Sequence, residues 1–445
     1  MEFKPTSSQL NFYSGNSDLD SKVWNLGLIQ VFPKIYTYEQ LNDAYNCLRR
    51  DHEAIRVKFK ETTDGPVSYL ENYKYIKFPY IDTDSEENLL EKARDLLNSP
   101  TDFYGMLENP IMFNTPTKSG IMISAHHIAV DGYSSYILAE DINKYLQNPE
   151  YRAVTQPYAE YIYNEKKHRS TKRYLRDYEF WQKEFDPLPK CSLFSDVNNS
   201  FDYSSSEVNL RVETGFLEKI KTFCKKSEIS VQSFFNSLYA VYFHKTTGLN
   251  HFTLGVPVLN RTTPAEFNTI GLYMHIVPLV VKCREKNIFF EVAKSVENSQ
   301  MNLFRHQKFT QTEIKKALEE KNVSVSRLFD IVADYQEFNS NDSYELKIPY
   351  SNSLPLPLEI HMQSFGSENH NLKIRYRTSI FTEKEIQTML NSIIAIAEDS
   401  LDNPHKKISD LEMLSADEKH KVLYEFNSTK TDYRKDKCIH ELFEE

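Results

Sequence analysis

The sequence predicts an α/β protein built from two lobes. A chain of 445 residues exceeds what one hydrophobic core can serve, since single cores stop growing at about 250–300 residues. Strand and helix patterns alternate in both halves, which is typical of α/β architecture. A charged helical stretch at residues 150–190 separates the halves. We therefore expect one lobe at residues 1–175 and the other at residues 176–410.

The first half begins with a helix that leads into a strand. Thr37 is a candidate N-cap, and apolar side chains then recur at helical spacing, at Leu41, Ala44, Tyr45 and Leu48. Residues 55–59 alternate apolar and polar side chains, so the chain continues as a strand.

A second strand is predicted over residues 120–127. Its two faces differ, with Ile121 and Ile123 on one and Met122 and Ser124 on the other. A helix follows over residues 134–147, and Ser134 or Ser135 is its expected N-cap.

The second half repeats this mixture. Helical periodicity covers residues 230–248 and 382–401, and strand patterns cover residues 251–259, 273–282 and 328–336. After Leu401 the sequence turns polar, and we expect a linker there rather than core.

Composition excludes several classes of protein. The net charge of -10 has the wrong sign for a general nucleic-acid binder. No apolar run approaches the roughly 18 residues of a membrane span. The N-terminus lacks the basic and apolar regions of a signal peptide, which predicts a cytoplasmic protein. The five cysteines show no CxxC spacing, so neither a zinc ribbon nor a disulfide framework is indicated.

The segment GIMISAHHIAVDGYSS, which starts at Gly120, carries the candidate chemistry. Neighbours on a strand point to opposite faces, so His126 and His127 cannot both aim at one metal ion. We expect one of these imidazoles to face a cleft and the other to be buried. Asp131 and Gly132 would form a turn in which glycine permits unusual backbone geometry. Taken alone, the segment could also be a strand that ends in two core histidines.

The segment resembles the HHxxxDG signature of condensation domains of nonribosomal peptide synthetases, and companion motifs follow in the family's order. They are TSSQLNFY from Thr6, RDHEAIRVKF from Arg50, YAEY from Tyr158, IGLYMHIVPLVV from Ile270, HQKF from His306 and SRLFDIVADYQ from Ser326. Three positions depart from the usual pattern: Asn11 stands for Arg, His275 for Asn and Ile276 for Thr. The resemblance covers roughly residues 5–410.

The resemblance implies two lobes similar to chloramphenicol acetyltransferase, arranged as a V-shaped pseudo-dimer around a central tunnel. The implied reaction is amide formation between a donor acyl thioester and the amine of a carrier-bound aminoacyl acceptor. His127 would take a proton from the amine or position it, and the sequence leaves both roles open. His126 would support the site from behind the strand. Asp131 would hold its loop through Arg261, and Gly132 would let substrate or backbone approach closely.

Three further positions enter by the same resemblance. Arg56, in the second motif, would be a structural support, and Tyr273 and His275 would line the tunnel. No metal and no cofactor are implied, because the thioester already activates the acyl group. The substrates would be carried on phosphopantetheine or coenzyme A.

Three related readings compete with this one. An epimerisation domain shares HHxxxDG but does not lead into an adenylation domain. A heterocyclisation domain usually replaces the histidines with aspartate. A non-catalytic condensation-like platform that recruits partners generally loses the second histidine, and His127 is present.

The two ends of the chain suggest its partners. FNSTKTDY and the residues after it resemble the start of an adenylation domain, so we expect residues 411–445 to be a linker and that start. The first motif lies within ten residues of Met1, so we expect the donor to arrive in trans. An acyl carrier protein or acyl-CoA would supply an acyl donor, as in starter condensation domains that N-acylate the first amino acid (lipoinitiation), and a peptidyl carrier protein would present the acceptor. The alternative is elongation with a peptidyl donor from another subunit.

Overall fold

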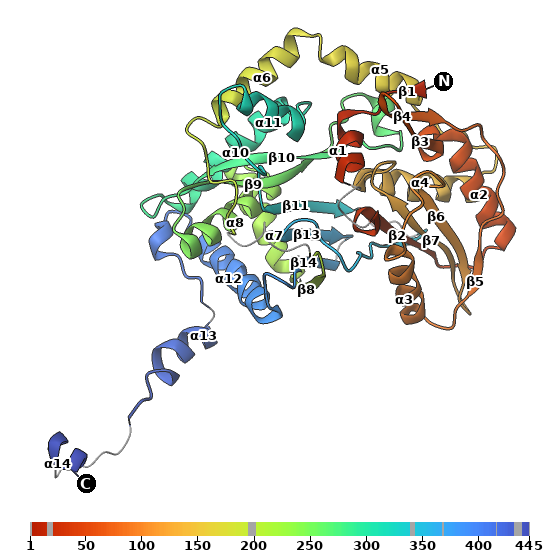
Figure 1. Ribbon diagram of the computed structural model, residues 1–445. Helices are drawn as coiled ribbons and strands as arrows, with labels where there is room; N and C mark the ends of the chain where they lie inside the picture. The colour runs from red at the N-terminus through yellow and green to blue at the C-terminus, as the bar shows by residue number, and fades with distance from the viewer. Residues whose placement is uncertain are drawn as a thin grey trace.

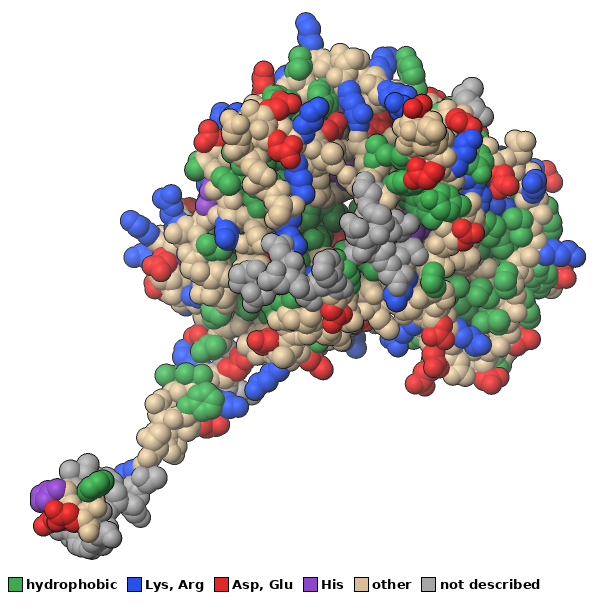
Figure 2. Space-filling model, in the orientation of Figure 1, with side chains coloured by type: hydrophobic (Ala, Val, Ile, Leu, Met, Phe, Trp, Pro, Cys, Tyr) green, Lys and Arg blue, Asp and Glu red, His purple; other side chains and the backbone are tan. Residues whose placement is uncertain are grey.

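A computed structural model describes residues 2–15, 21–194, 202–338, 343–366, 369–414, 416–430 and 438–444. Within these residues the chain forms two α/β lobes that lie side by side (Figure 1). Helices α5 (Tyr158–His168) and α6 (Lys172–Glu184) arch over the top of both lobes. The surface is hollowed between the lobes (Figure 2). The prediction of a two-lobed α/β fold is confirmed.

The first lobe is built on a five-stranded sheet in the order β12-β2-β7-β6-β5. These strands are β2 (Asn25–Phe32), β5 (Tyr80–Asp82), β6 (Glu108–Asn114), β7 (Ser119–His126) and β12 (Glu345–Lys347). Helix α3 (Glu86–Leu97) packs on one face of the sheet, and helices α2 (Tyr38–Asp51) and α4 (Gly132–Gln147) pack on the other. Helix α1 (Ser7–Gly15) lies at the edge of the lobe that borders the hollow.

Strand β7 lies between β2 and β6, so both of its faces are buried. Ile121 and Ile123 join the core beneath α2 and α4, whereas Met122 joins the core beneath α3. The predicted alternation is therefore confirmed. Because alternate residues share a face, the side chains of His126 and His127 leave the strand on opposite sides.

Helix α2 begins where the sequence predicts, because Thr37 and Gln40 form a capping box. Helix α4 differs from the prediction. Its N-cap is Asp131, whose carboxylate accepts a hydrogen bond from the backbone N–H of Ser134, so the helix starts at Gly132. The expected cap at Ser134 or Ser135 is wrong because a carboxylate stands one turn earlier, at the first free N–H groups of the helix.

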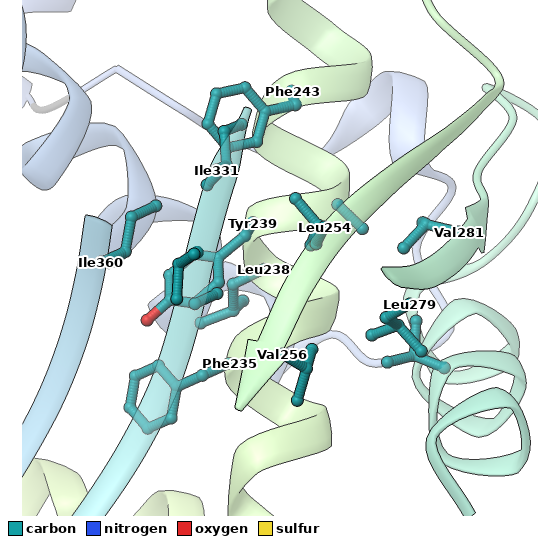
Figure 3. Packing of buried hydrophobic residues seen from close by; sticks show 14 of the residues in the cluster. Phe235, Leu238, Tyr239, Phe243, Leu254, Val256, Leu279, Val281, Ile331 and Ile360 are labelled. Carbon is teal, nitrogen blue, oxygen red and sulfur yellow. The ribbon is translucent and has the colours of Figure 1, made fainter. Parts of the chain in front are cut away.

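The second lobe holds a six-stranded sheet in the order β10-β9-β11-β13-β14-β8. These strands are β8 (Ser205–Arg211), β9 (His251–Val258), β10 (His275–Lys282), β11 (Ile331–Phe338), β13 (Leu358–Phe365) and β14 (Asn369–Arg377). Its core lies between this sheet and four helices, which are α7 (Thr214–Ser227), α8 (Val231–Thr247), α10 (Phe289–Arg305) and α12 (Glu383–Asp402). Figure 3 shows Tyr239 and Phe243 of α8 packed against Ile331 and Leu254.

Local signals set the ends of the long helices in this lobe. Ser230 caps α8 through the N–H of Ser233, and Gly248 ends it with a φ of 72°, in the left-handed region that favours glycine. Thr382 and Glu385 form a capping box at the start of α12. The helices and strands predicted for the second half are confirmed to within a few residues.

Smaller elements complete the two lobes. A three-stranded sheet in the first lobe has the order β1-β4-β3, from β1 (Glu2–Phe3), β3 (Val57–Thr62) and β4 (Gly65–Leu70). The strand predicted at residues 55–59 begins later, because Ile55 lies in a 3-10 turn. Helices α9 (Pro264–Phe267) and α11 (Gln311–Glu319) belong to the second half.

One segment of the second half returns to the first lobe. Strand β12 pairs antiparallel with β2, and the preceding Tyr344 is buried in the core of the first lobe. Helix α6 runs across the boundary expected at residues 175 and 176. The division into residues 1–175 and 176–410 stays a prediction, and β12 is a crossover that a division by sequence order does not represent.

The C-terminal segment begins inside the second lobe. Ile408 and Leu411 are buried in its core, so the expectation that the chain is linker from Leu401 is wrong for these residues. The chain then leaves the body through α13 (Ala416–His420) and ends in α14 (Ile439–Glu444) (Figure 1). The adenylation start proposed for residues 411–445 stays a prediction, and residues 415, 431–437 and 445 lie outside the described residues. No helix in the described part of the chain is long and apolar enough to span a membrane.

Candidate active site

The candidate site forms where β7 ends and α4 begins. The backbone N–H of His127 donates to the Trp24 carbonyl oxygen at 2.8 Å, which holds the end of the strand in place. At Asp131, one carboxylate oxygen accepts hydrogen bonds from both the backbone N–H and the hydroxyl of Ser134, each at 2.8 Å. The loop between His127 and Asp131 is therefore tied at both ends.

His127 is the partly exposed member of the histidine pair. Its ring stacks on Phe12 of α1, with centroids 5.4 Å apart and planes inclined by 12°. Nδ1 is buried, whereas Nε2 is accessible and has no hydrogen-bond partner among the described residues. Burial lowers the pKa of His127 more than the nearby charges of Asp131 and Glu359 raise it. At neutral pH the ring is therefore uncharged, with Nε2 available to accept a proton.

His126 is sealed inside the first lobe. Its Nδ1 accepts a hydrogen bond from the Ile128 N–H at 3.1 Å, and Phe103 packs edge-on against the ring. Burial and the neighbouring His127 lower its pKa to about 3. This position lets His126 support the strand end, and it offers no open path to a reacting group.

Asp131 and Arg261 come together across the two halves of the chain. Arg261 Nη1 lies 2.8 Å from Asp131 Oδ2, and Nη2 lies 3.2 Å from Oδ1, which is a bidentate pair. The backbone N–H groups of Tyr273 and Met274 also donate to Oδ2, each at 2.9 Å. Burial would raise the pKa of Asp131, but Arg261 and these hydrogen bonds hold it below its usual value. Asp131 is thus an ionised, fully bonded anchor that does not face the hollow.

The guanidinium of Arg261 has hydrogen-bond acceptors besides Asp131. Nε donates to the Glu266 carbonyl oxygen at 3.1 Å, and Nη2 donates to the Ser134 hydroxyl at 3.2 Å. The rings of Tyr133 and Tyr273 lie against it, with centroids 4.9 Å and 4.4 Å from Cζ. This buried cluster joins the helix that follows His127 to the second half of the chain.

Gly132 occupies the first turn of α4 rather than a separate turn. Its φ lies outside the left-handed region, and an added Cβ would meet only Met274 Sδ, at an ordinary contact distance of 3.9 Å. The expected unusual backbone geometry is therefore wrong. What Gly132 contributes is open space next to the candidate site.

The structure separates the two predicted tunnel-wall residues. Tyr273 is buried between the halves, where its hydroxyl donates to Gln156 Oε1 at 3.1 Å. His275 is partly exposed at the start of β10, an edge strand, opposite Val258. Burial of its ring nitrogens lowers the pKa of His275. Of the two, only His275 is partly exposed, although both of its ring nitrogens are buried, so the tunnel-wall role of these residues stays a prediction.

Arg56 lies in a supporting position. Its Nε donates to the Arg49 carbonyl oxygen and its Nη1 to the Glu71 carbonyl oxygen, both at 2.8 Å. These bonds join the end of α2 to the chain that leaves β4. They involve no group of the His127 loop.

Sequence reasoning missed several residues around His127. Phe12 could have been found, because it lies in the first motif. Ser134 could not, since its hydroxyl oxygen lies 2.9 Å from the Gly271 carbonyl oxygen and accepts from the Gly271 N–H at 3.0 Å, contacts that only the tertiary structure creates. Glu359 of β13 had no local signal either. Among the described residues, no group of three His, Cys, Asp or Glu side chains could hold a metal ion.

Comparison with known proteins identifies the architecture. The family model described as "Condensation domain" matches residues 6–423. Surfactin synthase subunit 1 of Bacillus subtilis (strain 168) is 26% identical over 426 residues, which cover 92% of this chain and 12% of the synthase. The chain therefore spans about an eighth of the length of that curated relative.

Solved structures show the same fold. The first condensation domain of the calcium-dependent antibiotic synthetase, in complex with a substrate analogue, superposes with a TM-score of 0.82 at 15% identity, covering 93% of this chain and 99% of that one. A variant of the starter condensation domain of rhizomide synthetase, in complex with C8-CoA and Leu-SNAC, has a TM-score of 0.81 at 15% identity, covering 93% and 98%. From the match of its sequence over almost its whole length, this chain belongs to the condensation-domain family.

Proposed function

We propose that this chain condenses a donor acyl thioester with the amine of a carrier-bound aminoacyl acceptor, and that the donor is an acyl group, so that the product is an N-acylated first residue. Condensation domains of peptide synthetases are acyltransferases that form amide bonds. The observation that carries the proposal is His127, an uncharged imidazole whose Nε2 is open and whose loop is held by Asp131.

His127 and its surroundings suit this chemistry. The acceptor amine arrives largely as an ammonium ion and must lose a proton before or as it attacks the thioester carbonyl carbon. Nε2 of His127 can accept that proton. The C–N bond then forms and the C–S bond breaks, while the nitrogen gives up its second proton and the departing thiolate is protonated, so that one proton is released to solvent overall. No cofactor enters this scheme, and the substrates would arrive on phosphopantetheine or coenzyme A.

A starter domain crystallised with C8-CoA is among the structural neighbours, which supports an acyl donor. The small apolar cavity next to the site, between β2, β7 and α4, has room for only about one water molecule and does not itself hold an acyl chain. Elongation with a peptidyl donor is the competing function.

The test supplies both kinds of donor to the full chain. The protein is incubated with a panel of aminoacyl N-acetylcysteamine thioesters and either octanoyl-CoA or a dipeptidyl thioester, and the products are identified by mass spectrometry. We expect N-octanoyl aminoacyl thioester. Product from the dipeptidyl donor alone would establish elongation instead, and no product from either donor would favour a non-catalytic platform.

A further inference from the structure

The sheet of the second lobe has one apolar face and one polar face. Leu358, Ile360 and Met362 of β13 point into the helix-covered core. Glu359 and His361 alternate with them and therefore lie on the opposite face. Asp334 on β11 and Arg375 on β14 share that face by the strand register.

These four charged side chains form one buried network. Arg375 Nη1 lies 2.7 Å from Glu359 Oε2, and His361 Nε2 lies 3.4 Å from the same oxygen. The other ring nitrogen of His361 lies 2.8 Å from Asp334 Oδ1. Burial would lower the pKa of His361, but Asp334 and Glu359 raise it to about 9. The network thus pairs two carboxylates with two cations.

One oxygen of this network is left open. Glu359 Oε1 has no hydrogen-bond partner among the described residues, and it is accessible, since the side chain is 17% exposed. Asp334, by contrast, uses its second oxygen to accept from Gln336 Nε2 at 2.7 Å. Burial would raise the pKa of Glu359, but Arg375 and His361 lower it to about 2. Glu359 therefore presents a permanent, rigidly held negative charge with one free acceptor.

The polar face is turned toward the first lobe. Arg375 Nη2 donates to the carbonyl oxygens of Ser351 and Ser353 at 3.0 Å and 3.2 Å. Between these two serines, the N–H of Asn352 donates to Asn98 Oδ1 at the end of α3 in the first lobe, at 3.0 Å. The charge of Glu359 also acts on His127. Leu97 and Ser99, the neighbours of Asn98, accept hydrogen bonds from Asn25 at their carbonyl oxygens, and Asn25 pairs with His126 at the end of β7. The Glu359 network therefore lies close to the strand end that precedes His127.

We propose that Glu359 binds the ammonium group of the acceptor, so that the amine is held between an anion on the second lobe and His127 on the first. This step rests on the proposed amide-forming function. Glu359 remains ionised throughout, because Arg375 and His361 hold its other oxygen. The proton of the ammonium passes to Nε2 of His127, and the freed amine attacks the thioester carbonyl carbon. Glu359 is a binding residue for the nucleophile, and His127 is its base.

The test separates a cationic acceptor from a neutral one. Two inert ligands are compared by calorimetry at pH 7: leucyl-pantetheine with an amide in place of the thioester, and the same molecule with a hydroxyl in place of its α-amine. The α-amine is largely charged at this pH. We expect Glu359→Gln to weaken the ammonium ligand about tenfold, as the loss of a charged hydrogen bond would. Affinity for the hydroxyl ligand should not change.

Glu337→Gln is the matched control. Glu337 is a carboxylate on β11 that pairs with Lys221 and contacts no member of the network, so both ligands should bind this variant as they bind the wild type. Equal affinity of the wild type for the two ligands would overturn the proposal. So would equal losses for both ligands in Glu359→Gln, or the same selective loss in Glu337→Gln.

If Glu359→Gln does not fold, Glu359→Asp replaces it. Aspartate keeps the negative charge but is one methylene shorter, so the carboxylate lies farther from the ligand. We then expect a smaller loss, confined to the ammonium ligand, and unchanged binding would overturn the proposal. The readout needs no turnover, so a wild type that forms no amide would contradict the proposed function without deciding the role of Glu359.

Discussion

At the scale of single residues, different degrees of burial give two adjacent histidines different roles. His126 is the last residue of β7, and His127 is the first residue after it. His126 is enclosed and bonded to the Ile128 N–H, whereas His127 keeps Nε2 open. Burial lowers the pKa of both rings, so both are neutral at physiological pH. Only one of them can exchange a proton with a ligand.

Replacing His127 by alanine should remove activity and spare the fold. We expect His127→Ala to lower the rate of amide formation by at least about a hundredfold, the usual range for loss of a general base. The melting temperature should change little, because the ring is partly exposed. Initial rates by mass spectrometry and thermal unfolding measure the two effects. His251→Ala is the control, since His251 lies at the end of β9 remote from Val258 and the candidate site. Near-normal rates in His127→Ala would refute the assignment.

At the scale of elements, Asp131 has two structural functions at the start of α4. It caps the helix through Ser134, and it holds Arg261 from the other half of the chain. Ser85 has only the first of these functions, as the N-cap of α3 that accepts from the N–H of Asn88. The two positions therefore allow the cost of a lost cap to be separated from the cost of a lost ion pair.

We expect Asp131→Ala to lower the free energy of unfolding by about 3–5 kcal/mol, because it leaves a buried guanidinium without its partner. Ser85→Ala should cost only about 1 kcal/mol, the value of a cap alone. Urea unfolding at neutral pH measures both. Equal costs for the two variants would show that the ion pair adds nothing to stability.

The same residue predicts a pH dependence. The pKa of Asp131 is lower in the folded protein than in the unfolded chain, where it is about 3.9. Its stabilisation is therefore complete above that value and is lost as the pH falls through the folded-state pKa. The stability gap between wild type and Asp131→Ala should be constant from pH 6 to pH 7 and should shrink at strongly acid pH.

At the scale of the whole molecule, the crossover at β12 ties the lobes together. Tyr344 and β12 belong to the first lobe, although β11 and β13, the strands before and after them in sequence, belong to the second. We expect Tyr344→Ala to lower the free energy of unfolding of the first lobe by about 3 kcal/mol, as the loss of a large buried side chain does. Calorimetry should then resolve two transitions where the wild type shows one.

Tyr104→Ala is the matched control for this change, because Tyr104 is 57% exposed in the first lobe. It should leave the unfolding profile unaltered. A single transition with an unchanged midpoint in Tyr344→Ala would mean that the crossover does not couple the lobes.

The sequence alone determined the features that depend on neighbouring residues. Apolar periodicity located the helices around Tyr45, Tyr239 and Ile393 and the strand at Ile121, because a period of 3.6 or 2 is a property of one segment. Ordered short motifs pointed to the family and to His127. Both kinds of signal are local in sequence, so they can be recognised in each segment without knowledge of the rest of the chain.

Only the tertiary structure decided which distant groups meet. Asp131 and Arg261 are 130 residues apart in sequence, and the bidentate geometry between them exists only once the two halves are packed. The open oxygen of Glu359 depends on Arg375 and His361 holding the other one. Burial and the charges of distant partners together shift the pKa of these groups, and both are properties of the packed molecule that a local pattern cannot encode.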